Sequence, residues 1–294
     1  MASPAVTVII PTFNWSAVLS YSVRSALRQT FTDFEVLVVG DGCTDNSGAV
    51  IEAMGDARVR WLNLPEHTGH QSGPNNEGLR HARGEFIAYL GHDDLWVRHH
   101  LACLVAALDA GADVAYGLTM LVGADGRYTE PAPRRLTYTP GLWIPPTGVA
   151  HRRRVIDGIG GWKPYRQLSV DPEVDLWQRA YQYGYRFAFV PRLTAVKFPA
   201  AWRRDVYRTR PHHEQARWFE RMERESDFEA VEMGHLLLTV LESRLLWRDG
   251  SYWTLLREFV AETRRRLRFR WAVGKNIEAR RRFKGAAANG RART

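Results

Sequence analysis

Short β-branched runs alternate with helical patterns through the first 120 residues of the chain. Apolar runs typical of buried strands lie at residues 5–10, 34–40, 59–64, 85–90 and 113–118. Apolar residues recur at helical spacing between them, near residues 16–29, 46–54, 72–82 and 97–109. Strands that alternate with helices form a mostly parallel sheet covered on both faces. The sequence therefore predicts an α/β, Rossmann-like fold, in which ligands bind beyond the carboxyl ends of the strands.

The regular alternation ends near residue 119. The later pattern predicts a hairpin over 119–130, a proline-rich connection over 131–148, a helix over 171–184 and a last strand over 185–191. Beyond Pro211, amphipathic patterns predict helices near 212–225, 229–247 and 251–270. We therefore expect three parts, namely an α/β domain over 1–210, a helical C-terminal region over 211–270 and a basic, flexible tail over 271–294.

The positive charge of this 294-residue chain, +9 overall, is concentrated in its C-terminal third. Residues 1–199 contain 19 basic and 19 acidic side chains, whereas residues 200–294 contain 22 and 13. A stretch with 12 basic residues and one acid begins at Arg264, and such a stretch can bind an anionic membrane surface. A solvated tail is the alternative. Nucleic acid is not favoured as a partner, because no recognition fold accompanies the charge.

Neither a targeting segment nor disulfide chemistry is indicated. The first residues lack a basic leader followed by an apolar core, and no run of about 18 apolar residues predicts a membrane span. Cys43 and Cys103 lie 60 positions apart, without the spacing of a disulfide framework or a zinc site. These features predict a cytoplasmic protein, and the basic end allows peripheral binding to the inner face of the membrane.

Carboxylates gather in three loops that the pattern places at the ends of strands or in the later half of the domain. The loops are "GDGCTD" at 40–45, "GHDD" at 91–94 and "VDPEVD" at 170–175. Loops at the carboxyl edge of a sheet converge, so these carboxylates are expected to share one cleft. Asp93 and Asp94 should repel each other unless a cation, a hydrogen-bond donor or water lies beside them. Mg²⁺ and Mn²⁺ take such oxygen ligands, while a helix N-cap is an equal alternative from spacing alone.

Four motifs, taken in order, resemble the family 2 glycosyltransferases of GT-A fold: "VTVIIPTFN", "VVGDGCTDNS", "GPNNEGLRHARGEFIAYLGHDDLW" and "DPEVDLWQRA". The resemblance covers roughly residues 5–200. It implies an inverting enzyme that uses Mn²⁺ or Mg²⁺ and a UDP-, dTDP- or GDP-linked sugar. The implied acceptor is a hydroxyl group of a glycan, a lipid-linked sugar or a small molecule. A nucleotide-sugar-binding protein without turnover is the alternative, and the C-terminal helices allow an oligomer.

The resemblance places six residues at the donor: Pro11, Thr12, Phe13, Asp41, Asn76 and Asp93. Among them, Phe13 would lie near the nucleobase and Asp41 would hydrogen-bond it. The pair Asp93 and Asp94 matches the metal-binding motif, in which Asp94 is expected to be the main ligand. Asp93 would meet the ribose or the diphosphate and serve as a second ligand. His212 and His213 are further metal-ligand candidates, with surface histidines at a helix start as the alternative.

Glu173 falls where the family has its catalytic base, with Asp175 and Asp171 as local rivals. On a helix, Asp171 and Asp175 share one face and Glu173 points elsewhere. The role of base therefore cannot belong equally to Glu173 and to an acid on the other face. Some of these acids, Asp171 above all, are expected to cap the helix instead. Trp162 matches a loop near the acceptor, with core packing as the alternative.

Four positions depart from the family pattern. Gly40 and Cys43 replace an aspartate and a serine of the nucleoside motif, Gly91 stands where many relatives have aspartate, and Asn75 takes the place of an arginine. In addition, Pro172-Glu173 stands where the family usually has Glu-Asp. Such losses make the remaining aspartate pair more critical, and they keep the alternative without turnover open.

Overall fold

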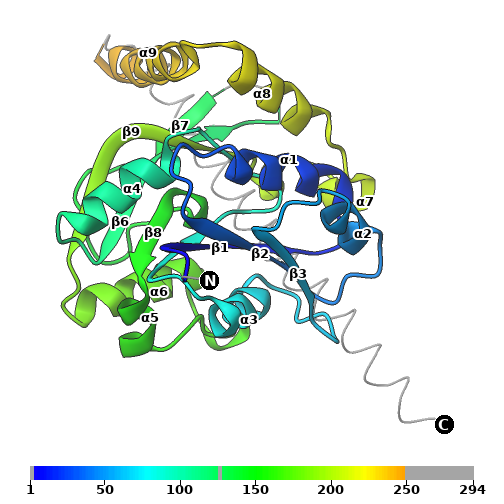
Figure 1. The fold of residues 1–294 in the computed structure, drawn as a ribbon. Helices are drawn as coiled ribbons and strands as arrows, with labels where there is room; N and C mark the ends of the chain where they lie inside the picture. Colours follow the sequence, from blue (N-terminus) through cyan, green and yellow to red (C-terminus); the bar gives the residue numbers. More distant parts are fainter. Residues whose placement is uncertain (1–2, 125–127, 249–294) are drawn as a thin grey trace, which may run out of the picture.

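Nine strands form one sheet at the centre of the computed structural model, which describes residues 3–124 and 128–248 (Figure 1). The strands are β1 (Val6–Thr12), β2 (Phe34–Gly40), β3 (Val59–Asn63), β4 (Phe86–Tyr89), β5 (Leu95–Trp96), β6 (Val114–Val122), β7 (Tyr128–Ala132), β8 (Val149–Arg152) and β9 (Phe187–Lys197). Their order across the sheet is β3-β2-β1-β4-β8-β6-β9-β5, and β7 pairs with β6.

Helices connect the strands and extend the chain beyond them. They are α1 (Ser16–Leu27), α2 (Ser47–Glu52), α3 (Ser72–His81), α4 (His100–Asp109), α5 (Arg153–Ile159), α6 (Pro172–Gln182), α7 (Val206–Thr209), α8 (His213–Arg224) and α9 (Phe228–Arg248). Short 3-10 turns lie at η1 (Pro146–Gly148), η2 (Tyr165–Gln167) and η3 (Ala200–Trp202). The predicted α/β architecture is confirmed, and each strand and helix predicted before residue 119 is present.

Alternate side chains along the central strands build two separate apolar cores, because successive residues of a strand point to opposite faces. In β1, Val8 and Ile10 pack in the core that includes α1 and α4. Ile9 instead packs in the core that includes α5 and α6, and in β2 the neighbours Leu37 and Val38 divide in the same way. Figure 1 shows α1 and α3 on opposite sides of the central strands. Every central strand therefore has two buried faces, as its continuous apolar run predicts.

The direction of pairing changes across the sheet. β1 pairs in parallel with β2 and β4, β2 with β3, and β6 with β9. β8 lies antiparallel between β4 and β6, and β5 and β7 also form antiparallel pairs. The sheet is thus parallel in its first half, as predicted, and mixed in its second half. The difference comes largely from β8, a strand of four residues that is too short to show a clear alternation in the sequence.

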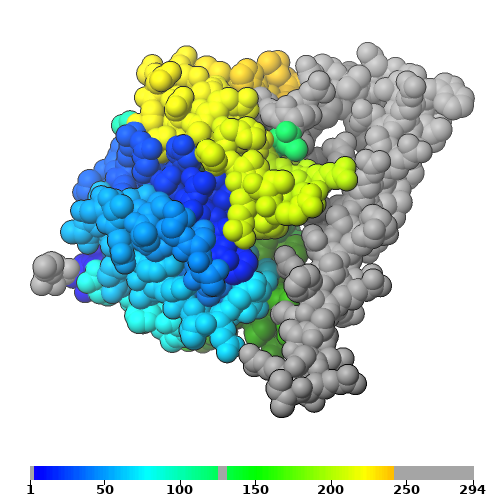
Figure 2. All heavy atoms as spheres, turned by 90° about the vertical axis from the view of Figure 1, so that its right-hand side faces the viewer, coloured from blue at the N-terminus to red at the C-terminus, as the bar shows by residue number. Residues whose placement is uncertain are grey.

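The C-terminal helices α8 and α9 pack on the sheet domain. Trp218 and Phe219 of α8 and Phe228 of α9 share an apolar cluster with Leu95 of β5 and Val196 of β9. Figure 2 shows the yellow segment that includes α8 lying over the blue N-terminal elements. Within the described ranges, no helix has the length and apolar character needed to cross a bilayer. The predicted helix over 251–270 and the predicted tail over 271–294 lie outside the described residues.

A buried carboxylate ties three segments together at the amino ends of the strands. Glu35 of β2 is 2% exposed and accepts a hydrogen bond from Thr7 Oγ1 of β1 at 2.8 Å. It also accepts hydrogen bonds from the main-chain N and the Nε of Arg83, which precedes β4, at 2.9 and 2.8 Å. Burial alone would raise the pKa of the Glu35 carboxyl, but the bonds from Arg83 and Thr7 outweigh it and lower the pKa. Glu35 is therefore a charged anchor at the edge opposite to the carboxyl ends.

We predict that Glu35→Gln lowers the free energy of unfolding by about 1–3 kcal/mol at neutral pH, because it removes a buried, charge-assisted acceptor. Since folding lowers the pKa of Glu35, its contribution is complete above the unfolded pKa and is lost as the pH falls through the folded pKa. Urea unfolding from pH 7 to pH 3 measures both effects. Glu85→Gln is the control, because Glu85 is 67% exposed in its pair with Arg152, and we expect a loss below about 1 kcal/mol. Equal losses in the two variants would contradict the assignment.

Candidate active site

The carboxyl ends of β1, β4 and β9 meet at one edge of the sheet. β1 and β4 pair in parallel, with Ile9 opposite Tyr89, so the residues after each strand lie side by side. His92 Nδ1 donates a hydrogen bond to the Pro11 carbonyl oxygen at 3.2 Å. β9 ends at Lys197, whose ammonium reaches the loop that follows β4. The aspartate loop therefore lies beside the carboxyl ends of β1 and β9. The sharing of one cleft by the loops 40–45, 91–94 and 170–175 stays a prediction.

Asp94 is fully buried, and donors of the protein surround its carboxylate. Thr147 Oγ1 and Lys197 Nζ donate to Oδ2, the latter at 3.0 Å, and the main-chain N of Phe198 donates to Oδ1 at 3.1 Å. A Cβ atom on Gly91 would lie 2.5 Å from Oδ2, so a larger residue does not fit beside this arrangement. Burial disfavours the Lys197 ammonium, but the carboxylate of Asp94 and its neighbours raise the pKa of Lys197. Asp94 is thus the buried half of an ion pair.

Asp93 lies next to this ion pair, and the residue is half-buried. Burial, followed by repulsion from Asp94, raises the pKa of the Asp93 carboxyl. Its carbonyl oxygen accepts a hydrogen bond from Gln215 Nε2 at 3.3 Å, which joins the loop to α8. Helix α4 begins only at His100, with the residue before it as N-cap, so neither aspartate caps a helix. The N-cap alternative for the pair is wrong.

The two histidines expected as metal ligands begin α8, and both are exposed. His212 is the N-cap residue and His213 the first residue of the helix. Within residues 3–124 and 128–248, no three His, Cys, Asp or Glu side chains gather as a metal-binding group. The structure therefore does not assemble Asp93 and Asp94 with the two histidines. Asp94 is bonded to Lys197 and fully buried, so Asp93 is the more exposed member of the pair.

Glu173 lies in the first turn of α6, directly after Pro172, whose fixed backbone favours the start of a helix. Its side chain is 9% exposed. Trp143 Nε1 donates to Oε1 at 2.9 Å, and Gln71 Nε2 donates to Oε2 at 3.3 Å. Burial raises the pKa of the Glu173 carboxyl despite the bond from Trp143. A carboxylate of this kind is suited to accept a proton.

Asp175 lies on another face of α6 than Glu173, and two cationic side chains contact its carboxylate. Its carboxylate accepts a hydrogen bond from Arg179 Nε at 2.7 Å and lies 3.6 Å from Lys163 Nζ. Arg179 in turn donates to the Ile159 carbonyl oxygen at 2.8 Å, so the pair links α6 to the end of α5. Asp171 occupies the N-cap position of α6, but its side chain makes no capping hydrogen bond. The Asp171 side chain therefore does not cap the helix, and the expectation that it would do so is wrong.

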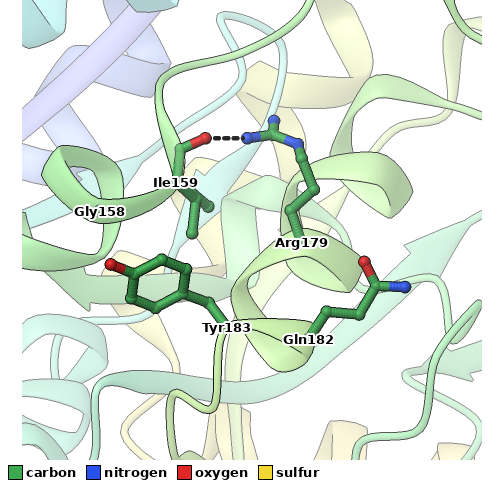
Figure 3. A pocket seen from close by; sticks show the side chains of 5 residues that line it. All are labelled: Gly158, Ile159, Arg179, Gln182 and Tyr183. Carbon is green, nitrogen blue, oxygen red and sulfur yellow. Dashed lines mark hydrogen bonds between the residues drawn. The ribbon is translucent and has the colours of Figure 1, made fainter.

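A shallow hollow lies at the other end of α6. Figure 3 shows its lining residues: Gly158, Ile159, Arg179, Gln182 and Tyr183. The Arg179 guanidinium at its rim is already bonded to the Ile159 carbonyl oxygen. None of the candidate catalytic or donor-binding residues lines this hollow, so it is separate from the carboxyl-edge site.

Asp41 follows β2 and is saturated by the loop after β3. Its Oδ1 accepts hydrogen bonds from the main-chain N and the Oγ1 of Thr68, at 2.8 and 2.6 Å. Its Oδ2 accepts from the main-chain N of Gly69 at 3.0 Å and lies 2.8 Å from His67 Nδ1. The His67 ring also stacks on Phe13, with 3.8 Å between the centroids and 20° between the planes. Asp41 and Phe13, both expected at the nucleobase, are thus neighbours joined by one imidazole.

The remaining expected donor residues are buried or bonded to the protein. Pro11 is buried and Thr12 is 2% exposed, and the Thr12 carbonyl oxygen accepts a hydrogen bond from the Asp41 main-chain N at 2.8 Å. Asn76 Oδ1 accepts from the main-chain N of Trp162, and its Nδ2 donates to the Trp162 carbonyl oxygen, both at 2.8 Å. Trp162 itself is 2% exposed within the second core, which confirms the packing alternative for its ring.

Three residues beside these carboxylates were not singled out from the sequence: Lys197, Trp143 and His67. The sequence does mark Lys197, because it is a single basic residue directly after the mostly apolar segment "LTAV" at the carboxyl end of the last strand. Trp143 and His67 lie in loops, where no periodicity marks the direction of a side chain.

Two solved structures with the same fold are in complex with sugar nucleotides. TarS residues 1–349 of S. aureus, in complex with UDP-GlcNAc, superposes with a TM-score of 0.58 at 20% identity, over 80% of this chain and 71% of that one. The mannosyltransferase PcManGT from Pyrobaculum calidifontis, in complex with GDP-Man and Mn²⁺, gives a TM-score of 0.55 at 21% identity, over 93% and 84%. These similarities establish a GT-A fold.

Curated relatives match a little under half of the chain. WfgD of Escherichia coli, a UDP-Glc:alpha-D-GlcNAc-diphosphoundecaprenol beta-1,3-glucosyltransferase, is 30% identical over 137 residues, which is 45% of this chain and 53% of WfgD. The GalNAc(5)-diNAcBac-PP-undecaprenol beta-1,3-glucosyltransferase of Campylobacter jejuni is 29% identical over 129 residues, 43% of this chain and 41% of that protein. The chain thus spans about half the length of these curated relatives.

The model of the family described as Glycosyl transferase family 2 matches residues 7–171, which is more than half of the chain. The chain belongs to this family.

Proposed function

We propose that the chain is an inverting glycosyltransferase that moves a sugar from a nucleoside-diphosphate donor to a hydroxyl group of an acceptor. The observation that carries the proposal is a pair of unlike carboxylates around one ammonium. Asp93 is partly exposed and Glu173 is buried, and Lys197 acts on the pKa of both. Two carboxylates that differ in exposure and lie near one cation are suited to separate roles in one reaction.

The donor would bind with its base at Phe13 and Asp41 and its diphosphate near Asp93. A UDP-, dTDP- or GDP-linked sugar is the proposed class, and TarS, which shares the fold, is in complex with UDP-GlcNAc. The E. coli and C. jejuni relatives are named for undecaprenyl-diphosphate-linked acceptors. These names favour a lipid-linked sugar over the free glycan or small molecule that the sequence also allows. Binding of the basic stretch from Arg264 to an anionic membrane stays a prediction of the sequence.

The proposed cofactor is an Mn²⁺ or Mg²⁺ ion that Asp93 would hold. Such ions need only one or two carboxylates when phosphate oxygens and waters complete the shell, and Asp93 offers one carboxylate that Asp94 repels. A bound cation would stabilise the negative charge that develops on the departing diphosphate. Asp94, which the sequence favoured as the main ligand, is assigned instead to holding the loop through Lys197. His212 and His213 are not needed for this arrangement.

Glu173 would accept the proton of the acceptor. The hydroxyl oxygen forms a bond to the anomeric carbon while the bond from that carbon to the diphosphate oxygen breaks. The hydroxyl proton passes to the Glu173 carboxylate, which Trp143 and Gln71 hold in place. Asp175 is not assigned this role, because Arg179 and Lys163 already neutralise it.

The glycines that depart from the family pattern are consistent with an active enzyme. A Cβ atom on Gly40 would lie 2.4 Å from Asn63 Oδ1, and one on Gly91 would lie 2.5 Å from Asp94 Oδ2. Each glycine therefore accompanies a local packing arrangement that a larger side chain would disturb. Local packing thus accounts for these two glycines without loss of turnover.

We predict opposite phenotypes for the two adjacent aspartates. Asp93→Asn should weaken Mn²⁺-dependent binding of UDP at least about tenfold, a change of about 1.4 kcal/mol, with unfolding changed by less than about 0.5 kcal/mol. Asp94→Asn should instead lower the free energy of unfolding by about 2–4 kcal/mol, because it leaves the mostly buried Lys197 ammonium without its partner. Calorimetric titration and urea unfolding measure the two effects. Loss of metal-dependent binding in a fully stable Asp94→Asn protein would reverse the assignment.

We predict that Glu173→Gln keeps donor binding and lowers kcat about 10²- to 10⁴-fold, because it removes the proton acceptor and preserves the shape of the side chain. A base works only when it is deprotonated, so the raised pKa of Glu173 should place the acidic limb of the pH–rate profile above pH 4.5, the ordinary value for glutamate. Asp175→Asn is the matched control on the same helix. It should lower the thermal midpoint and retain turnover, and the reverse pattern in the two variants would refute the role of Glu173.

A further inference from the structure

His67 makes two contacts with residues assigned to the nucleobase. Its ring lies parallel to Phe13, at 3.8 Å between centroids, and so covers one face of that ring. Its Nδ1 lies 3.0 Å from the Asp41 carbonyl oxygen and 2.8 Å from Asp41 Oδ2. Both partners are acceptors only, which places the proton on Nδ1. The imidazole therefore stacks on an aromatic face and donates its ring N–H to the Asp41 carbonyl oxygen, with the buried carboxylate oxygen Oδ2 2.8 Å from the same nitrogen.

A nucleobase with a ring N–H would make the same pair of contacts. Uracil, thymine and guanine each carry such an N–H between polar groups, and each has a π-face that can stack on phenylalanine. Cytosine and adenine have an unprotonated ring nitrogen at that position, which would face the carboxylate unfavourably. We propose that His67 occupies the place of the donor's base in the free protein and is displaced when a base with a ring N–H binds. This inference rests on the proposed function.

The surrounding geometry allows the side chain to leave while Asp41 stays in place. The His67 side chain is 44% exposed, so rotation about its side-chain bonds can carry the ring into solvent. Its backbone is fixed, because Gly42, at a φ of +69°, approaches the His67 main-chain N so closely that a Cβ atom on Gly42 would lie 2.6 Å from it. Thr68 and Gly69 still supply three hydrogen bonds to Asp41 after the imidazole departs. A single rotation thus uncovers the face of Phe13 and the two Asp41 oxygens, carbonyl O and Oδ2, that lie beside Nδ1.

Displacement of His67 reduces the apparent affinity, since a ligand that binds only the open form is penalised by the fraction of protein that is closed. His67→Ala removes that penalty. We expect UDP to bind this variant more tightly than the unmodified protein, on the order of fivefold, in calorimetric titrations with Mn²⁺. His81→Ala is the control, because His81 is a histidine of equal exposure, 44%, paired with Glu77 on α3. CDP should bind more weakly than UDP to all three proteins.

Histidine NMR signals of the unmodified protein give a second measurement that does not depend on a variant. Saturating UDP should shift the His67 ring signals toward those of a solvated imidazole, because the ring loses the shielding of Phe13, and should leave His81 unchanged. Weaker or equal UDP binding by His67→Ala, or unshifted His67 signals at saturation, would overturn the inference and leave the proposed function standing. Absence of nucleotide binding by all three proteins would overturn both.

Discussion

The ion pair between Asp94 and Lys197 is the interaction on which the arrangement of the site depends. It joins the loop after β4 to the end of β9, and the Thr147 hydroxyl brings the turn η1 to the same carboxylate. Breaking a buried pair of this kind on one side is costly, because the remaining charge loses its partner in a medium of low polarity. Lys197 also lies near Asp93 and Glu173, so the ammonium counters the repulsion among three carboxylates. Asp93 and Glu173, the two proposed functional acids, therefore lie near the ion pair of Asp94 with Lys197. Both carboxylate oxygens of Asp94 already accept hydrogen bonds from the protein.

The two edges of the sheet use buried carboxylates for different purposes. At the amino ends, Glu35 is surrounded by donors from Thr7 and Arg83, which lower its pKa and keep it charged. At the carboxyl ends, Asp93 and Glu173 have pKa values raised mainly by burial. The protein compensates the negative charge of a carboxylate with a raised pKa only in part. Such a carboxylate can therefore bind a cation or a proton. This difference separates the edge that stabilises the fold from the edge where chemistry is proposed.

Local patterns in the sequence were sufficient for the elements from β1 to α4 other than β5, because each of these has either a continuous apolar run or helical spacing. The strand β5 has only two residues, which is too short for a pattern. The same patterns could not rank Asp93 against Asp94. The ranking depends on Thr147 and Lys197, which lie 53 and 103 residues further along the chain. The saturation of Asp41 by residues 67–69 was hidden for the same reason, since adjacency of the loops after β2 and β3 says nothing about which side chains turn inward. Glu173 and Asp175 were separable in part, because helical geometry alone places them on different faces.

The most direct test of this account is a crystal structure of the protein with UDP and Mn²⁺. We expect the uracil ring to lie on Phe13, the diphosphate and the ion to lie beside Asp93, and Asp94 to keep its contact with Lys197. An ion coordinated by Asp94, with the Lys197 contact broken, would show instead that Asp94 binds the ligand and does not hold the site together.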